Sequence, residues 1–459
     1  MIIGNTTSVC PVCLKTISAQ KIIKDNHHIY LDKTCPQHGS FSTLIWEDSL
    51  ESYSAWDRNS MVSEPPVFPN PAQKGCPNDC GLCEEHLRKG CCMLLELTNR
   101  CNLRCPVCFA SAGEQKPHDL SMEEIEKQYD FLMNHGGPFN IQLSGGEPTM
   151  RDDLPEIIRM GRSKGFTFFQ LNTNGIRLAE SPSYAKELKE AGLNTVFLQF
   201  DGLSDQTYQI LRGRPLLDEK LFAIRNCASA GLGVVLVPVI APDVNEHEIG
   251  RILHFALENM PAIRGVHFQP VSYFGRCNLE EPKIRITIPR MLRAIESQTK
   301  GLMKQSDFGS GGAENPYCSF HASYMRRKDG TLKALAQKDS QCCCTTSDDS
   351  RNFVANQWTG VESNSECGCC QPAKETSNNC CCGESADSKV TEWNSFDEFL
   401  EQARMNTFTV SGMIFQDAFN LDLDRLKRCY ICEVDSRYGM VPFCAYNLTD
   451  LNGRSLYRK

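Results

Sequence analysis

Short apolar runs alternate with helical patterns through the middle of the chain, from residue 93 to about residue 275. Each run has the length of a buried strand, and each is followed by a segment with helical periodicity. The runs are MLLELT (93–98), NIQLS (140–144), TFFQLN (167–172), TVFLQFD (195–201), GVVLVPVI (233–240) and GVHFQPV (265–271). Strand–helix units of about 30 residues predict parallel strands joined by right-handed crossovers.

The helical segments carry start and stop signals. Ser121 followed by Glu124 is typical of a capping box at a helix start, and DDLPEIIRMGRSKG (152–165) ends in a glycine that stops a helix. SYAKELKEAG (183–192) and EHEIGRILHFALEN (246–259) are further helices. Six such units predict an α/β fold, a partial (β/α)6 TIM-like barrel, with its site at the C-terminal ends of the strands.

Composition changes divide the rest of the chain. The proline-rich stretch 60–75 is typical of a linker. Residues 338–390 are polar and cysteine-rich, with too little apolar sequence for a core, so we expect a loop or disorder. The predicted domains are a metal module (1–59), a linker with an auxiliary-cluster segment (60–92), the barrel (93–300), an auxiliary-cluster region (301–337), the cysteine-rich insert (338–390) and a C-terminal auxiliary-cluster domain (391–459).

Charge and hydropathy exclude some partners. The formal net charge is −8 and there is no Lys/Arg block, so a nucleic-acid partner is not expected. The longest apolar run, GVVLVPVIAP (233–242), is too short to span a membrane. The N-terminal sequence lacks the features of a signal peptide, so we expect a cytoplasmic protein that is not integral to a membrane.

The 26 cysteines are the most unusual feature of this composition. In a long cytosolic chain, clustered thiols indicate metal or iron–sulfur ligation rather than disulfides. Cys10, Cys13, Cys35 and His38 have the spacing of a zinc-ribbon or rubredoxin-like site. A Cys3His set favours zinc, mononuclear iron stays open, and free thiols are the remaining alternative.

Two triads share the spacing C-x3-C-x2-C. Cys101, Cys105 and Cys108 follow the first predicted strand directly, and three thiolates would leave one iron of a 4Fe–4S cluster open. The other triad, Cys76, Cys80 and Cys83, has a nearby candidate fourth ligand in Cys91, with Cys92 as the alternative. This second set predicts a fully ligated auxiliary cluster, with a zinc site as the alternative.

A third triad lies near the C-terminal end of the sequence. Cys429, Cys432 and Cys444 lack a local fourth ligand, for which Cys318 is the best candidate and His321 the next. This set predicts a second auxiliary cluster, or else a structural zinc site. Nine further cysteines between 342 and 382 have no predicted partner; a redox relay, a metal- or sulfur-delivery arm and no catalytic role all stay open.

The segment CNLRCPVC (101–108), followed by Phe109, resembles the cluster motif of the radical S-adenosylmethionine (SAM) superfamily, and SGGEP (144–148) resembles its GGE motif. The resemblance implies that SAM chelates the open iron and yields a 5′-deoxyadenosyl radical on reduction. It also implies that Gly145 and Gly146 let the backbone approach the ligand and that Glu147 accepts a hydrogen bond from the SAM ammonium. Strand-end position makes four more residues candidates for SAM contacts, or else ordinary turn residues: Thr173, Asn174, Asp201 and Asn245.

The order of motifs along the chain, from CPVC to VPFCAYN, is similar to a radical SAM subgroup that includes tetraether lipid synthases and pterin-methylating enzymes. Within it, the cysteine-rich insert is most similar to the group named radical SAM (seleno)protein TrsS. The resemblance implies C–C bond formation or methylation at an unactivated carbon of an unknown organic substrate, with a low-potential electron donor such as ferredoxin or flavodoxin. Sulfur or selenium insertion, protein maturation and, remotely, a non-enzymatic iron–sulfur electron carrier are the alternatives.

Overall fold

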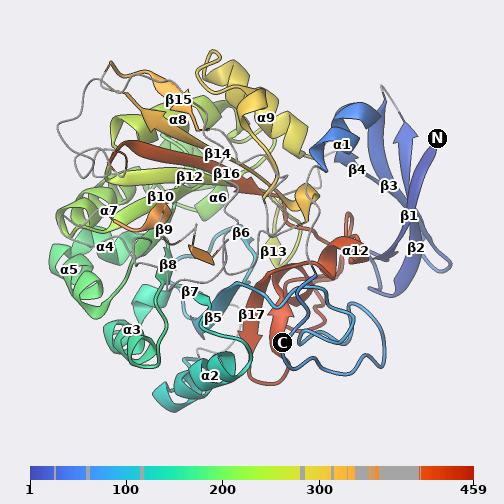
Figure 1. Cartoon of the computed structure of the whole chain (residues 1–459), viewed down its shortest axis with the longest axis horizontal. Coiled ribbons are helices and arrows are strands. Elements are labelled where there is room, and N and C mark those ends of the chain that lie inside the picture. The colour runs from blue at the N-terminus through green and yellow to red at the C-terminus, as the bar shows by residue number, and fades with distance from the viewer. Residues whose placement is uncertain are drawn as a thin grey trace, which may run out of the picture.

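The chain forms a small N-terminal antiparallel sheet beside a larger α/β unit (Figure 1). The computed structural model describes residues 1–24, 27–57, 63–113, 118–279, 285–311, 315–327, 329–335, 351–352, 355, 357–360, 403 and 405–458. Apart from a few residues between 351 and 360, the predicted cysteine-rich insert lies outside the described residues, so its disorder and the roles of its cysteines stay predictions.

The N-terminal sheet is a meander in which each strand pairs antiparallel with the next. Alternating polar and apolar residues bury one face of the sheet, where Ile29, Leu31 and Trp46 lie. A short helix follows, begun by Ser49, whose hydroxyl accepts from the Ser52 N–H at 3.3 Å. The elements are β1 (Ile2–Val9), β2 (Thr16–Lys24), β3 (His28–Cys35), β4 (Gly39–Trp46) and α1 (Leu50–Trp56).

The larger unit is built on parallel strands that neighbour one another in chain order, which confirms the predicted partial barrel. These strands are β5 (Cys92–Thr98), β7 (Asn140–Gly145), β8 (Phe169–Thr173), β9 (Thr195–Gln199), β10 (Gly233–Val237) and β12 (Ile263–Pro270), with β11 (Val239–Ile240) also pairing with β12. Within the described residues the two end strands of the whole sheet do not pair with each other, so the barrel is open.

Helices on the outer side of the strands complete the main core. The predicted capping box is present, because the Ser121 hydroxyl accepts from the Glu124 N–H at 3.2 Å and the Glu124 carboxylate accepts from the Ser121 N–H at 2.8 Å. The helices are α2 (Met122–Asn134), α3 (Leu154–Ser163), α4 (Ile176–Glu180), α5 (Pro182–Ala191), α6 (Asp205–Arg212), α7 (Leu217–Ser229), α8 (Ile249–Glu258) and α9 (Ile288–Gln298). In the described ranges no helix is long and apolar enough to cross a membrane.

Strands from the later part of the chain extend both edges of the parallel strands. At the β12 edge lie β16 (Thr407–Met413), β14 (Ser319–Arg326) and β15 (Leu332–Ala334); at the β5 edge lie β17 (Ile431–Asp435) and β18 (Gly439–Pro442). Residues 414–430, here called the bridging segment, therefore connect the two edges and contain α12 (Leu423–Leu426); α13 (Phe443–Tyr446) follows β18. The sequence did not predict these strands.

The N-terminal sheet packs on the bridging segment. The Lys33 ammonium, which is 3% exposed, donates to the Ala418 carbonyl at 2.7 Å, and the Ser8 hydroxyl donates to the Leu421 carbonyl. Lys21 pairs with Asp422 at 2.7 Å. Hence the small metal module is attached to the chain that connects the two edges of the barrel.

Candidate functional site

The loop after β5 carries Cys101, Cys105 and Cys108 at the C-terminal end of the first parallel strand. Leu103, between the first two cysteines, is buried in a small apolar cluster with Ile176, Tyr208 and Leu216. Cys108 lies in β6 (Val107–Cys108), which pairs antiparallel with β13 (Arg276–Cys277). The three thiols lie near enough to one another to interact electrostatically.

Two arginines that the sequence analysis missed hold this loop. Arg276 donates through Nε to the Cys105 carbonyl at 2.7 Å and through Nη1 to the Ala112 carbonyl at 3.3 Å. The Arg212 guanidinium donates to the Val107 carbonyl at 3.3 Å and to the Cys105 thiol. An arginine outside a motif gives no sequence signal for such contacts.

Burial raises the pKa of Cys101 to about 12, while the Leu103 N–H opposes the shift. Burial also raises the pKa of Cys105, and Arg212 opposes that shift. Without metal these thiols hold their protons, which iron would displace on binding. Three clustered thiols on one loop fit a 4Fe–4S cluster with one open iron.

The glycines of the GGE turn approach the chain that enters this loop. Gly145 has φ of +123°, and a Cβ there would collide with the Thr98 carbonyl, while a Cβ at Gly146 would collide with the Arg100 carbonyl. The Gly146 N–H donates to the Thr98 carbonyl at 2.7 Å, and the Glu147 N–H donates to the Arg100 carbonyl at 2.8 Å. The structure therefore shows these glycines closing one loop on another; their expected approach to a ligand stays a prediction.

Glu147 is 1% exposed, and its carboxylate is bound by protein donors. Oε1 accepts from the Thr149 N–H at 3.1 Å, the Thr149 hydroxyl at 2.7 Å and the Thr173 hydroxyl at 2.6 Å. Oε2 accepts one bond, from the Asn174 N–H at 2.7 Å. The carboxylate thus ties the ends of β7 and β8 together, and Oε2 retains the capacity to accept a further bond.

Asn174 connects the β8 end to the cluster loop and to a buried lysine. Its Nδ2 donates to Asn102 Oδ1 at 2.7 Å, and its carbonyl accepts from the Lys220 ammonium. Lys220 is fully buried on α7, also donates to Gln199 Oε1 at 2.8 Å, and has its pKa lowered to about 7 by burial. Nothing in the sequence distinguished this lysine from those on solvated helix faces.

In the structure the side chains of Asp201 and Asn245, which the sequence analysis named as candidate SAM contacts, are hydrogen-bonded to other protein groups. Asp201 is fully buried and accepts from Arg212 Nε at 2.6 Å, from Arg212 Nη2 at 2.8 Å and from the Val239 N–H at 3.0 Å. Asn245 is also fully buried; its amide donates to the Asp201 and Val239 carbonyls, each at 2.8 Å, and accepts from the Ala241 N–H at 2.9 Å. Both side chains stabilise the strand-end loops.

A chain of amides crosses the inner face of the strands. Gln142 donates to the Cys92 thiol at 2.8 Å, Asn172 donates to Gln142 at 3.1 Å, and Gln170 donates to Asn172 at 2.8 Å. Cys92, the alternative fourth ligand in the sequence analysis, therefore points inside the barrel. Further along this face, the ring of His267 stacks on Phe197 with centroids 5.7 Å apart.

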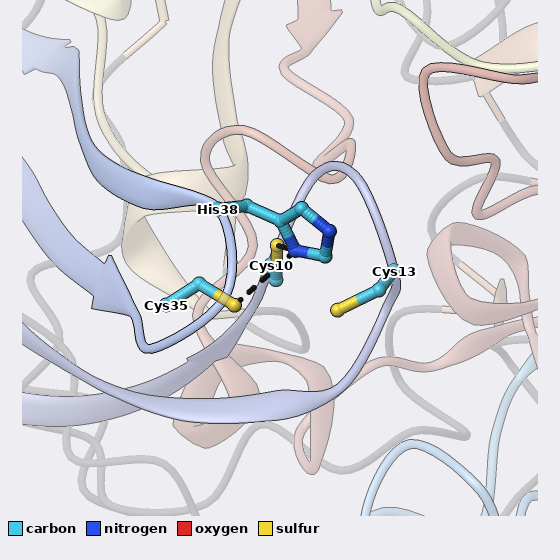
Figure 2. Close-up of side chains that lie close together, drawn as sticks. All are labelled: Cys10, Cys13, Cys35 and His38. Carbon is cyan, nitrogen blue, oxygen red and sulfur yellow. Dashed lines mark hydrogen bonds between the residues drawn. The ribbon is translucent and has the colours of Figure 1, made fainter.

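The N-terminal metal group is assembled as the spacing predicts. Figure 2 shows Cys10, Cys13, Cys35 and His38 pointing toward one another, and their ligand atoms lie within 4.8 Å of one another. Sγ of Cys10 and Sγ of Cys35 each lie 3.4 Å from His38 Nδ1. Ligands about 2.3 Å from a tetrahedral zinc ion are about 3.8 Å apart, so this group fits a mononuclear metal.

The second triad surrounds a small cavity next to the bridging segment. Cys76, Cys80 and Cys83 line it together with His86 and Lys427. His86 Nε2 lies 2.8 Å from the Cys429 carbonyl. Cys91 is not among the residues that line this cavity, and its N–H donates to the Tyr430 carbonyl at 2.9 Å.

The third triad lies in and around β17. The buried thiol of Cys444 interacts electrostatically with Cys429 and Cys318, and Arg425 donates to the Cys318 thiol at 3.3 Å. Cys432 is the register partner of Met93 and packs in the main core, although its thiol also interacts electrostatically with Cys429. Cys318, Cys429 and Cys444 are thus brought together. His321 lies in β14, where its backbone pairs with Gly309.

Comparison with known proteins agrees with this architecture. The radical SAM superfamily matches residues 95–256, and the HMPTM N-terminal zinc ribbon domain matches residues 2–47. The chain is 34% identical to the 7,8-dihydro-6-hydroxymethylpterin dimethyltransferase of Methanocaldococcus jannaschii over a gapped alignment of 479 positions, which covers 96% of this chain and 93% of that protein. It is 32% identical to the GTP 3′,8-cyclase of Paenarthrobacter nicotinovorans, over 44% of this chain and 58% of that protein.

Among solved structures, Streptococcus suis SuiB bound to precursor peptide SuiA aligns with a TM-score of 0.40 and 16% identity, over 47% of this chain and 46% of that one; this likeness is too weak to bear on function. Radical SAM proteins use a 4Fe–4S cluster and SAM, for which the loop after β5 supplies three thiols. The near full-length match and the zinc ribbon identify the group within the superfamily. The chain belongs to the radical SAM superfamily, in the subgroup that includes this dihydropterin dimethyltransferase.

Proposed function

We propose that this radical SAM enzyme methylates, or otherwise forms a C–C bond at, an unactivated carbon of a reduced pterin. The observation that carries the proposal is the identity of 34% over 96% of the chain to a protein named as a dihydropterin dimethyltransferase. The barrel supports it, because polar amides on the inner face of the strands suit a heterocycle rich in donors and acceptors better than a hydrocarbon chain.

Cys101, Cys105 and Cys108 would hold the cluster. When bound and reduced, the cluster and SAM together supply a 5′-deoxyadenosyl radical that abstracts hydrogen from carbon. In this proposal the chain's own residues position the ligand: Gly145 and Gly146 shape the turn, Oε2 of Glu147 accepts from the SAM ammonium, and Thr173 and Asn174 orient that carboxylate. Such charge-assisted bonds are worth about 1.5–3 kcal/mol each.

The remaining metal centres are also proposals. Cys10, Cys13, Cys35 and His38 would hold zinc, supported by the ligand geometry and the zinc-ribbon match. Cys76, Cys80 and Cys83 would hold an auxiliary cluster. Its fourth ligand would be Cys91 or another nearby donor. Cys318, Cys429 and Cys444 would hold a second auxiliary cluster, and the packing of Cys432 in the main core makes it the weakest member of that set.

Cellular placement follows from the same chemistry. Thiols that ligate metal need a reducing compartment to stay reduced, which supports the cytoplasm. A low-potential donor such as ferredoxin or flavodoxin would supply the electron.

Turnover of anaerobically reconstituted, reduced protein with SAM and 7,8-dihydro-6-hydroxymethylpterin tests the function. We expect 5′-deoxyadenosine formation that the pterin accelerates and a pterin product heavier by methyl groups, both abolished in Cys105→Ala. Formation of 5′-deoxyadenosine that no pterin affects would contradict the pterin assignment and favour another radical SAM reaction, such as sulfur or selenium insertion.

A further inference from the structure

Glu433 in β17 is a buried carboxyl group without a hydrogen bond. It is 1% exposed, and neither Oε1 nor Oε2 has a hydrogen-bond partner among the described residues. Because an unmet buried acceptor is costly, such a group in a folded enzyme calls for a ligand or another explanation.

The register of β17 places Glu433 on the inner side of the barrel. Its partner in β5 is Leu94, whereas the neighbouring pair, Cys432 and Met93, packs in the main core beneath the helices. Successive side chains of a strand alternate between faces, so Glu433 shares the inner face with Cys92 and Glu96. Cys92 receives the first bond of the amide chain from Gln142.

Arg458, a cation that interacts electrostatically with Glu433, is already paired with other groups. Arg458 donates to Glu96 through Nη2 at 2.6 Å and Nη1 at 2.9 Å, and to Asn447 Oδ1 at 2.7 Å. Of the two carboxylates on this face, Glu96 is therefore paired and Glu433 is not. The Glu96–Arg458 pair also lines a cavity of about 140 Å³ that reaches the GGE turn, whose lining includes Thr98, Gly145, Gly146 and Tyr446.

We infer that Glu433 is the substrate-recognition residue of this enzyme and that its carboxylate accepts the two parallel N–H donors of an aminopyrimidinone ring. This inference rests on the proposed pterin function and names the edge of the pterin that the protein reads. A ring N–H beside an exocyclic amino group presents two donors side by side, which match the two oxygens of one carboxylate.

Binding of a pterin analogue distinguishes a substrate-recognition role of Glu433 from a purely structural role. In the corresponding pteridine-2,4-dione an oxygen replaces the 2-amino group, so one donor becomes an acceptor facing the carboxylate. One lost charge-assisted bond corresponds to about tenfold or more in affinity. We therefore expect the wild-type enzyme to bind the 2-amino-4-oxo pterin at least about tenfold more tightly than the dione.

Glu433→Gln should reverse this preference, because a glutamine amide offers one acceptor for the ring N–H and one donor for the new oxygen. Binding of 7,8-dihydro-6-hydroxymethylpterin and of the matching dione would be measured by anaerobic equilibrium dialysis on the metal-loaded, SAM-bound protein. Asp435→Asn, on the same strand but paired with Arg437, is the matched amide substitution and should keep the wild-type preference. Equal iron content, SAM affinity and thermal midpoint would show that each variant is folded.

The outcomes are distinct. A reversed preference in E433Q with a normal preference in D435N supports the inference. Wild-type binding of the pterin with an unchanged preference in E433Q overturns it and leaves the proposed function standing. Failure of the wild-type enzyme to bind either pteridine overturns the proposed function, and the inference with it.

Discussion

Replacing Thr173 by valine tests whether the Glu147 network stabilises the fold or serves SAM alone. The substitution keeps shape and β-branching but removes a hydroxyl that is 5% exposed. That hydroxyl donates to Glu147 Oε1 at 2.6 Å and accepts from the Gly175 N–H at 3.1 Å. Losing one charge-assisted bond and leaving one buried N–H unsatisfied should lower the free energy of unfolding by about 3–5 kcal/mol in the absence of SAM.

Thr195→Val is the matched control. Thr195 is fully buried, and its hydroxyl donates only to the neutral Gly233 carbonyl at 3.1 Å. Its loss should lower the free energy of unfolding by about 1 kcal/mol.

Both differences in the free energy of unfolding can be measured by urea unfolding of the metal-loaded, SAM-free proteins under anaerobic conditions. The curves are fitted with one shared dependence of free energy on urea concentration. The reasoning is refuted if Thr173→Val is no less stable than Thr195→Val while its SAM affinity, measured by calorimetry, falls at least about tenfold. That result would make Thr173 a ligand contact and not a support for Glu147.

Other parts of the structure give further predictions. Cys35→Ser should remove one zinc per chain and leave the iron content unchanged, since Cys35 belongs to the N-terminal group only. Elemental analysis measures both metals, and a loss of iron would contradict this assignment. Lys33→Met removes the hydrogen bond to the Ala418 carbonyl and should lower the free energy of unfolding by about 1–3 kcal/mol. Proteolysis near residue 418 should become faster, and an unchanged cleavage rate would argue against this attachment. Burial lowers the pKa of His267 to about 4, below the value near 6.5 expected when unfolded, so the unfolded chain binds the extra proton. Stability should therefore fall as the pH drops from about 6.5 toward 4, and His267→Gln should flatten this part of a pH–stability curve.

Local patterns predicted the central architecture well. Five of the six predicted parallel strands match an observed strand to within two residues at both ends, and the sixth, 233–240, covers β10 and β11. The Ser121–Glu124 pair begins α2 as expected. These features depend on side chains that are neighbours in sequence: apolar runs long enough to bury and caps three residues apart. The N-terminal metal group was predictable for the same reason, since each knuckle is a local motif.

Long-range pairing was not predictable from the same information. β16 and β17 join strands whose sequences lie about 140 and 340 residues earlier, and no local pattern selects those partners. The sequence also could not show which polar side chains of the site are already hydrogen-bonded within the protein. Asp201 and Asn245 have the residue types of ligands, but their positions allow Arg212 and nearby backbone groups to use all their polar atoms.

β16 and β17, which flank the six parallel strands on either side, have a consequence for how the chain is synthesised. As a ribosome releases the chain, β5 and β12 each emerge with one bare edge, and the strands that cover those edges, residues 431–435 and 407–413, are made about 340 and 140 residues later. Unpaired strand edges invite misassociation between nascent chains. A nascent chain therefore exposes two strand edges until these late strands are made, and the proposed cluster that uses Cys429 and Cys444 can assemble only after them.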